Sequence, residues 1–154
     1  MTSLVDMRVN VASAPVIAAH LRRCDDDFIP RLSDRIEIDE YSRKIAGRAM
    51  RFEAWAIGSL VGLVAAYFDA DGHTAYITTV SVDPQHRKQG LASRLLIQCV
   101  AHAQERGYAR VLLEVDRENE PAIALYEDLG FTMADVTDRT ISMRRDIQPM
   151  SRQA

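Results

Sequence analysis

Residues 80–92 read VSVDPQHRKQGLA. The apolar alternation at the start of this stretch predicts a strand, and a basic turn containing Gly90 leads from it into an amphipathic helix. In a turn from a strand into a helix, several backbone N–H groups point at one place, at the positive end of the helix dipole. Residues 80–92 are therefore predicted to form a strand, a phosphate-binding turn and a helix.

The side chains of the turn fit the same interpretation. Gly90 places no side chain where a pyrophosphate would approach, and Ala92 keeps the following backbone accessible. Arg87 and Lys88 add positive charge and donors for phosphate oxygens. The alternative is that the glycine merely starts a helix and that both basic side chains are solvated.

Turn signals and periodicity divide the rest of the chain into strands and helices. The expected strands span residues 4–11, 51–57, 60–68, 74–82, 111–115, 131–136 and 140–143. The expected helices span residues 14–23, 39–46, 90–106 and 120–129, with cap candidates Ser13, Asp39 and Asn119. Gly58–Ser59 and Asp71–Gly72 are tight-turn signals, so the second, third and fourth strands should run antiparallel. The pattern predicts a single α+β domain over residues 1–147, a mixed sheet with helices on its faces, and a polar tail at 148–154.

Composition argues against several classes of function. The net charge of −3 gives the whole molecule no electrostatic attraction to nucleic acid or acidic membranes. No apolar run approaches the roughly 18 residues of a membrane span, and the initial MTSLVDMRVN lacks the regions of a secretion signal. Cys24 and Cys99 do not suggest a disulfide framework, and the histidines show no metal-ligand spacing. We therefore expect a cytoplasmic protein with reduced thiols, no metal, and neither a nucleic-acid nor a membrane partner.

A second informative segment, residues 112–131, reads LLEVDRENEPAIALYEDLGF. It combines a strand, a short polar loop, Asn119, a helix that carries Tyr126, and a closing Leu-Gly-Phe. Together the two segments resemble the GCN5-related N-acetyltransferase (GNAT) superfamily, and residues 112–131 are most similar to its bacterial ribosomal-protein N-terminal acetyltransferases. The family's acetyl-CoA signature, Arg/Gln-x-x-Gly-x-Gly/Ala, is filled here by Arg87, Gly90 and Ala92.

The resemblance implies the acyl-CoA N-acyltransferase fold, a twisted and mostly antiparallel sheet flanked by about four helices. It also implies acetyl-CoA as cosubstrate, with the pantetheine arm lying where two strands of the sheet splay apart. Val80 and Val82 would give main-chain contacts and Asn119 a side-chain contact to that arm, although Asn119 can equally be only a helix cap. The residues that the resemblance places around the pyrophosphate are Arg87, Lys88, Gln89, Gly90, Leu91 and Ala92.

Amine acetylation passes through a tetrahedral intermediate that expels a thiolate, so a hydroxyl that protonates the sulfur speeds the reaction. By resemblance Tyr126 is that acid, whereas its spacing alone also fits an inward-facing stripe of the helix. Glu114 interrupts an apolar strand, where it is either solvated or partly buried, and the resemblance makes it the base that accepts the amine proton. Other candidates for the base are Glu53, Tyr76, His73 and a water relay.

The leading prediction is transfer of the acetyl group to the primary amine of a small molecule by direct attack. A protein amino terminus or lysine is the alternative acceptor, and a CoA-binding module without catalysis is the alternative of a different class. Residues 1–50 resemble the ribosomal acetyltransferases only weakly, so the peptide acceptor of those enzymes is less well supported than their fold and cosubstrate. This region holds basic residues that either recognise an acidic acceptor or are solvated: Arg31, Arg35, Arg43, Lys44 and Arg48. The family implies that a homodimer can form, although the sequence carries no signal for one.

Overall fold

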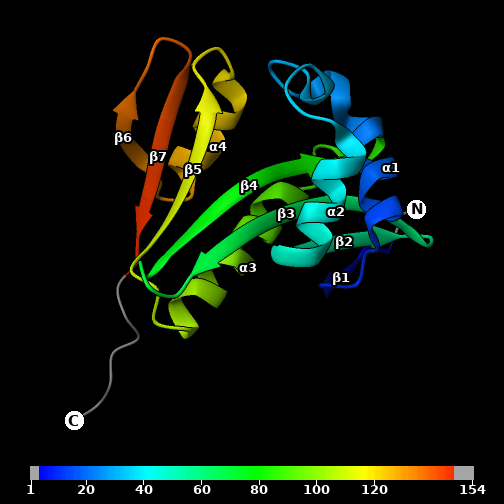
Figure 1. Cartoon of the computed structure of the whole chain (residues 1–154), viewed down its shortest axis with the longest axis horizontal. Helices are drawn as coiled ribbons and strands as arrows, with labels where there is room; N and C mark the ends of the chain where they lie inside the picture. Colours follow the sequence, from blue (N-terminus) through cyan, green and yellow to red (C-terminus); the bar gives the residue numbers. More distant parts are fainter. Residues whose placement is uncertain (1–3, 148–154) are drawn as a thin grey trace.

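The computed structural model describes residues 4–147, whose strands form one sheet in the order β1-β2-β3-β4-β5-β7-β6 (Figure 1). The strands are β1 (Asp6–Val9), β2 (Met50–Ala56), β3 (Ser59–Asp69), β4 (Thr74–Val82), β5 (Arg110–Asp116), β6 (Thr132–Val136) and β7 (Thr140–Asp146). The α-helices in this part of the chain are α1 (Ala14–Cys24), α2 (Ile38–Arg48), α3 (Leu91–Glu105) and α4 (Glu120–Asp128). The short 3₁₀ turns are η1 (Asp25–Asp27), η2 (Leu32–Asp34) and η3 (Pro84–His86). The predicted α+β class, with a mixed sheet and helices on its faces, is confirmed.

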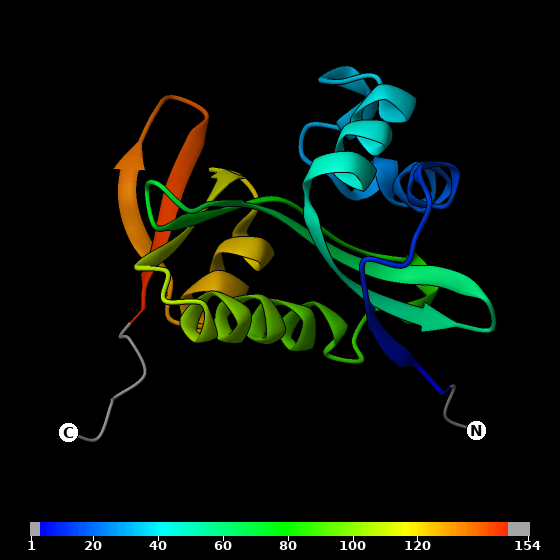
Figure 2. The same cartoon turned by 60° about the horizontal axis from the view of Figure 1, so that its bottom comes forward.

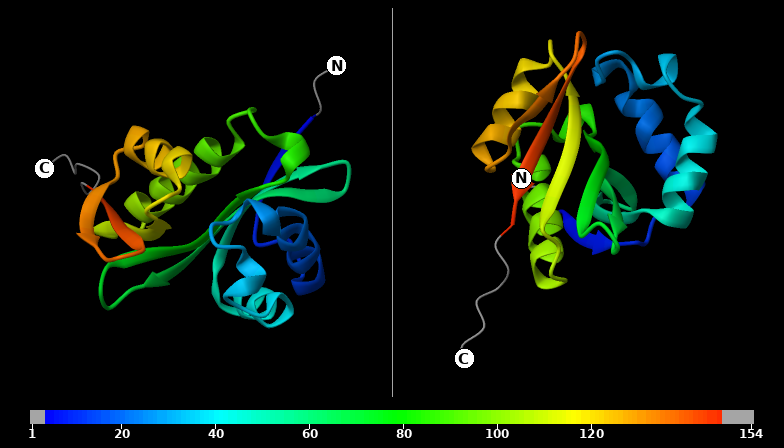
Figure 3. Two further views of the ribbon diagram at one scale, coloured as in Figure 1. Left: turned by 90° about the horizontal axis from the view of Figure 1, so that it is seen from above. Right: turned by 60° about the vertical axis from the view of Figure 1, so that its left-hand side comes forward.

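Helices cover both faces of the sheet (Figure 2 and Figure 3). Leu60, Leu63 and Ala65 of β3 pack in the cluster that α1 and α2 form with the sheet. Val61 and Val64 of the same strand belong to the cluster on the other face, which includes α3 and part of α4. A strand that is covered on both faces reads as a continuous apolar run rather than an alternating one, and this explains the sequence of β3.

Strands β4 and β5 pair over only part of their length. Their parallel ladder joins residues 74–77 to residues 110–113, and beyond it the strands diverge (Figure 1). The N–H of Asp83 donates to the carbonyl of Val61 in β3 at 2.8 Å. Because successive strand residues point their N–H groups to opposite sides, those of Val80 and Val82 face the side of β5. The splayed strands implied by the resemblance are therefore present.

Two local predictions need correction, and a third is confirmed in position only. The turn between β2 and β3 is Ile57–Gly58 rather than Gly58–Ser59, and φ values of 50° and 74° give this pair the left-handed geometry of a two-residue hairpin turn. The cap of α2 is Glu37, whose carboxylate accepts a hydrogen bond from the N–H of Asp39, the predicted cap. Ser13 occupies the cap position of α1, but its side chain makes no cap hydrogen bond.

Strand β1 is shorter than the predicted residues 4–11. Asn10 adopts a left-handed φ of 57°, and its side-chain oxygen accepts a hydrogen bond from the N–H of Arg51 at 2.7 Å. This geometry ends the ladder with β2 at Val9. The predicted tail, residues 148–154, lies outside the described residues. None of the helices within residues 4–147 is long and apolar enough to cross a membrane.

Candidate active site

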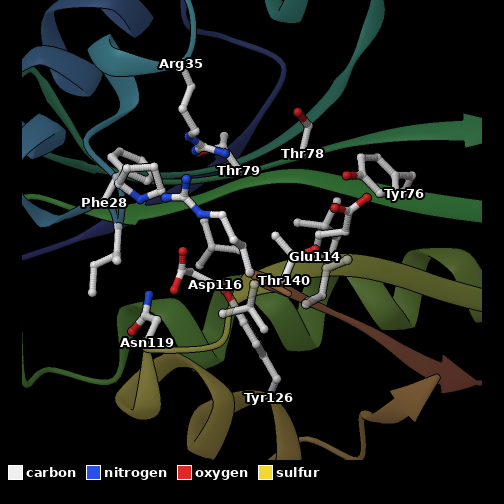
Figure 4. A pocket seen from close by; sticks show the side chains of 17 residues that line it. Phe28, Arg35, Tyr76, Thr78, Thr79, Glu114, Asp116, Asn119, Tyr126 and Thr140 are labelled. Atoms are coloured by element: carbon white, nitrogen blue, oxygen red, sulfur yellow. The ribbon is translucent and has the colours of Figure 1, made fainter. Parts of the chain in front are cut away.

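A cavity of about 370 Å³ lies between β4 and β5 where the two strands diverge (Figure 4). Its walls come from both strands, from the segment between α1 and α2, from the start of α4 and from the turn between β6 and β7. The side chains that matter most for its chemistry are Arg35, Tyr76, Glu114, Asn119, Tyr126 and Arg139. The two residues predicted to be catalytic, Glu114 and Tyr126, therefore line the same cavity.

A second cavity of about 180 Å³ adjoins the first on the side of the predicted phosphate turn. Its lining includes Val82, Arg87 and Ala92. Residues that line both cavities are Phe28, Val80, Asn119 and Tyr126. The turn before α3 and the predicted catalytic residues thus lie along one path through the molecule.

The predicted phosphate turn has the geometry of a helix start with open space in front of it. Gly90 is the N-terminal cap residue of α3, and its φ of 73° is a conformation that favours glycine. A side chain added at Gly90 would meet no atom within 4 Å. The first N–H groups of α3 lack acceptors within their own helix, so they are available to an anion.

The signature arginine is already paired. Arg87 forms an ion pair with Asp27, which ends the short turn that follows α1. Both side chains are partly exposed. An anion that binds the Arg87 guanidinium would compete with the Asp27 carboxylate.

The position of Tyr126 fits both interpretations, that of a core residue and that of a residue of the site. It is a buried residue of α4, its ring centroid is 6.0 Å from that of Phe131, and it belongs to the core cluster on that face. It also lines both cavities. Burial raises the pKa of the Tyr126 hydroxyl to about 12, so the group keeps its proton at neutral pH.

Glu114 lies on the exposed side of β5, as the alternation of its strand predicts. Across the cavity Tyr76 is half-exposed on β4, and Figure 4 shows the two side chains in the same part of the cavity. Burial raises the pKa of Tyr76, and the negative charge of Glu114 adds to the shift while Arg35 opposes it. The Tyr76 hydroxyl is therefore within electrostatic reach of a carboxylate and of a guanidinium.

Asn119 acts as the cap of α4. Its side-chain oxygen accepts a hydrogen bond from the N–H of Ala122 at 3.3 Å, which confirms the predicted cap. The same residue lines both cavities, so its side-chain amide group also borders the space where the pantetheine arm is expected. A contact with that arm stays a prediction.

Two other candidates for the base do not line the cavity. Glu53 is fully buried in β2, where its carboxylate accepts hydrogen bonds from the backbone N–H groups of Val11 and Ala12 and pairs with Arg51. His73 lies in the turn between β3 and β4. Alternation alone could not separate a buried structural carboxylate from one in a cleft. Tyr76 is the remaining alternative within the cavity.

Sequence spacing missed a polar network beside the second cavity. Nδ1 of His20 on α1 lies 2.7 Å from a carboxylate oxygen of Asp83, and its Nε2 lies 2.8 Å from the Ser81 hydroxyl. Arg23 donates to the other Asp83 oxygen at 2.9 Å. Cys24 adds a thiol whose sulfur is 3.8 Å from Nε2 of His20. The ligand atoms of His20, Cys24 and Asp83 all lie within 4.8 Å of one another, contrary to the expectation that no histidine has metal-ligand spacing.

The contacts of this network are those of a structural clamp. Both nitrogens of the imidazole and both carboxylate oxygens already have polar neighbours within the network. It ties α1 to the end of β4, immediately before the phosphate turn. The four-residue spacing of His20 and Cys24 on one helix face was the only local signal, because Asp83 is distant in sequence.

The basic residues of the first 50 positions do not form one cluster in the structure. Arg35 lines the larger cavity, whereas Arg31 pairs with Asp34. The remaining members lie on α2 around a different hollow: Arg43, Lys44 and Arg48. Arg139 enters the larger cavity from the β6–β7 turn, and no sequence pattern drew attention to it.

Residues 16–131 match the Acetyltransferase (GNAT) family, and the chain belongs to this family. The resemblance inferred from residues 80–92 and 112–131 is thereby confirmed. Members of the family share a fold and a signature. The acceptor of each protein must be argued from its own cavity.

Among individual proteins, the chain is 41% identical to a mycothiol acetyltransferase of Thermobispora bispora over 86 residues, which are 53% of this chain and 29% of that protein. It is 34% identical over 89 residues to the [ribosomal protein bS18]-alanine N-acetyltransferase of Escherichia coli, covering 58% of this chain and 59% of that enzyme. The chain thus spans less than two thirds of either relative. The crystal structure of the Escherichia coli ribosomal-protein-S18-alanine N-acetyltransferase has the same fold, with a TM-score of 0.77, 23% identity and 97% of each chain covered. So does an N-acetyltransferase of Thermoplasma acidophilum solved with coenzyme A, at a TM-score of 0.74, 14% identity, and coverage of 93% of this chain and 99% of that one.

Proposed function

We propose that this protein transfers the acetyl group of acetyl-CoA to the primary amine of a small molecule. The observation that carries the proposal is the pair of adjoining cavities, which share Val80, Asn119 and Tyr126 and connect the turn before α3 with Glu114. Membership of the GNAT family supports the reaction class.

Acetyl-CoA would bind along this path. Its pyrophosphate would meet the N–H groups at the start of α3, where Gly90 leaves open space. Its pantetheine arm would run between β4 and β5, beside the N–H groups of Val80 and Val82 and the side chain of Asn119. The thioester would then lie near Tyr126, at the junction of the two cavities.

The transfer itself would be a direct displacement. Glu114, directly or through a water, would accept a proton from the amine, whose nitrogen would form a bond to the thioester carbonyl carbon. A backbone N–H of β4 would stabilise the oxygen that becomes negative in the tetrahedral intermediate. As the carbon–sulfur bond breaks, Tyr126 would give its proton to the sulfur, and CoA would leave as a thiol.

Tyr126→Phe tests this mechanism. The variant keeps the ring packing and removes the hydroxyl, so kcat should fall on the order of 10²-fold while the affinity for acetyl-CoA changes little. Thiol release would measure turnover, and calorimetric titration with acetyl-CoA would measure binding. Tyr108→Phe is the matched control, because Tyr108 packs against Phe68 and lines neither cavity of the site. Unchanged turnover in Tyr126→Phe would rule out the acid assignment.

A peptide amino terminus is the second candidate acceptor. It is favoured by the pattern of Glu114, Asn119 and Tyr126 and by the similarity to the bS18-alanine N-acetyltransferase of Escherichia coli. A screen of amino acids, amino sugars, polyamines and short peptides for thiol release separates the two acceptor classes. Binding of acetyl-CoA and CoA without thiol release from any amine would instead indicate a CoA-binding module.

A further inference from the structure

We propose that the amine accepted by this protein carries a free carboxylate, which Arg35 binds with help from Arg139. The acceptor class would then be amino acids and amino-acid conjugates rather than polyamines or neutral amino sugars. This inference rests on the proposed function, because it specifies the acceptor of the same site.

Arg35 and Arg139 differ in their partners from three arginines near the site that form ion pairs. Arg23 on α1, Arg31 on the α1–α2 segment and Arg87 in the phosphate turn each pair with a carboxylate, those of Asp83, Asp34 and Asp27 respectively. Neither Arg35 nor Arg139 has a carboxylate partner among residues 4–147. Their side chains therefore offer the charge and the donors that an anionic ligand needs.

Arg35 is directed into the cavity. In Figure 4 its side chain extends from the α1–α2 segment toward Thr79 of β4, on the side of the cavity away from Tyr126. Arg139 lines the same cavity from the β6–β7 turn, which belongs to the other half of the splayed sheet. An anion held by both arginines would bridge the mouth of the cleft from one wall to the other.

The cavity also presents the opposite charge. Glu114 and Asp116 of β5 both line it, and one oxygen of Asp116 already accepts a hydrogen bond from the N–H of Glu118. Burial raises the pKa of the Tyr76 hydroxyl, Glu114 raises it further and Arg35 lowers it, so both charges act on this part of the cavity. The lining of the cavity therefore holds charges of both signs, the carboxylates of Glu114 and Asp116 on β5 and the guanidinium groups of Arg35 and Arg139. A zwitterion complements this arrangement, whereas a polyamine would place a second cation against Arg35.

The test compares amines that differ only in the anion. Thiol release from acetyl-CoA would be measured with the full chain for a set of L-amino acids and for the amide of each, which has nearly the same size without the negative charge. We expect kcat/KM to be about 10- to 100-fold higher for the preferred amino acid than for its amide, as is typical of a charged hydrogen bond. Equal or better use of the amides, or a preference for peptides whose carboxylate is remote from the amine, would overturn the proposal.

Substitutions test whether Arg35 itself binds the carboxylate or whether any loss of positive charge has the same effect. Arg35→Gln should raise KM for the amino acid about 10-fold or more and KM for the amide much less, so the preference for the acid over the amide in kcat/KM should fall about 10-fold. Arg35→Gln/Arg139→Gln should remove the remaining preference for the acid. Arg31→Gln is the matched control, because Arg31 lies on the same segment, pairs with Asp34 and does not line the cavity. An equal rise in KM for acid and amide would contradict the assignment.

Binding measurements distinguish failure of this inference from failure of the proposed function. The same amino acids and amides would be titrated into the protein saturated with CoA and followed by calorimetry. Binding of an amino acid that depends on Arg35, without thiol release from any amine, would refute the transferase and retain the carboxylate site. Thiol release with amines that bind equally well in Arg35→Gln would retain the transferase and refute the carboxylate site. Absence of binding by every amino acid would refute the carboxylate site as well.

Discussion

Glu53 provides the sharpest test of how the loop after β1 is held against β2. Its carboxylate is fully buried, and it accepts hydrogen bonds from the N–H groups of Val11 and Ala12 at 3.1 and 3.2 Å and from the indole of Trp55 at 2.9 Å. Its other oxygen is 3.2 Å from Nε of Arg51, whose side chain is 8% exposed. Glu53→Gln preserves the shape of the side chain and removes the charge.

The cost follows from what the substitution leaves behind. Arg51 would stay buried without a counter-charge, and breaking a buried ion pair on one side costs about 3–5 kcal/mol. An amide nitrogen would also face an N–H donor where the carboxylate accepted one. A loss of this size is a large part of the roughly 5–15 kcal/mol that stabilises a typical domain. At about 2–4 °C per kcal/mol for a domain of this size, the melting temperature should fall by roughly 6–20 °C.

Urea unfolding followed by circular dichroism would measure the change in the free energy of unfolding. Glu118→Gln, at an exposed loop position, is the control and should change the stability little. The double variant Glu53→Gln/Arg51→Met should recover part of the loss, because it removes both charges and leaves an amide oxygen to accept from the N–H groups of Val11 and Ala12. A loss below about 1 kcal/mol for Glu53→Gln would refute the estimate. A normal stability with lost turnover would return Glu53 to the candidates for the catalytic base.

Three further results are expected. Asp27→Asn frees Arg87 from its carboxylate partner and should tighten acetyl-CoA binding a few-fold in calorimetric titrations; unchanged affinity would mean that Asp27 and the cosubstrate do not compete. Burial by itself would raise the pKa of Asp83, but hydrogen bonds from the imidazole and guanidinium beside it outweigh that effect and lower the pKa. These contacts therefore contribute their full stability above the unfolded-state pKa of about 4, and this contribution is lost as the pH falls through the lower folded-state pKa. In urea titrations between pH 6 and pH 3, Asp83→Asn should accordingly lose less stability than the wild type. Burial raises the pKa of both thiols, Cys24 and Cys99, to about 12, so a disulfide reagent at pH 8 should react slowly with the native protein and quickly after unfolding; fast labelling of the native protein would contradict their burial.

The elements of the fold could be predicted because their signals are local. The strand and helix around Gly90 and the cap at Asn119 depend on neighbours within a few residues, and the structure has both. Ile57 shows the limit of such signals. A β-branched residue with φ above zero is not expected, and the sequence therefore predicts the turn one residue too late.

The charges of the site could not be predicted in the same way, because their partners are distant in sequence. From the sequence, Glu53 is a candidate base. In the structure, its carboxylate is bound by N–H groups of the loop after β1. Arg87 reads as a free phosphate ligand until η1 brings Asp27 to it. Arg139 lies in a polar turn without any distinctive sequence pattern. It lines the cavity because the order of the strands places the β6–β7 turn there.

The clamp between His20 and Asp83 also bears on how such a protein can change its acceptor. It anchors α1 to the strand end that precedes the turn before α3, while the segment that follows α1 contributes Phe28 and Arg35 to the lining of the larger cavity. Mutations between those two residues can therefore alter the shape and charge seen by the amine without moving the clamp or the start of α3. Under the proposed function, a new acceptor could therefore be acquired through changes in a short stretch of chain, while the start of α3 kept its place for the acetyl donor.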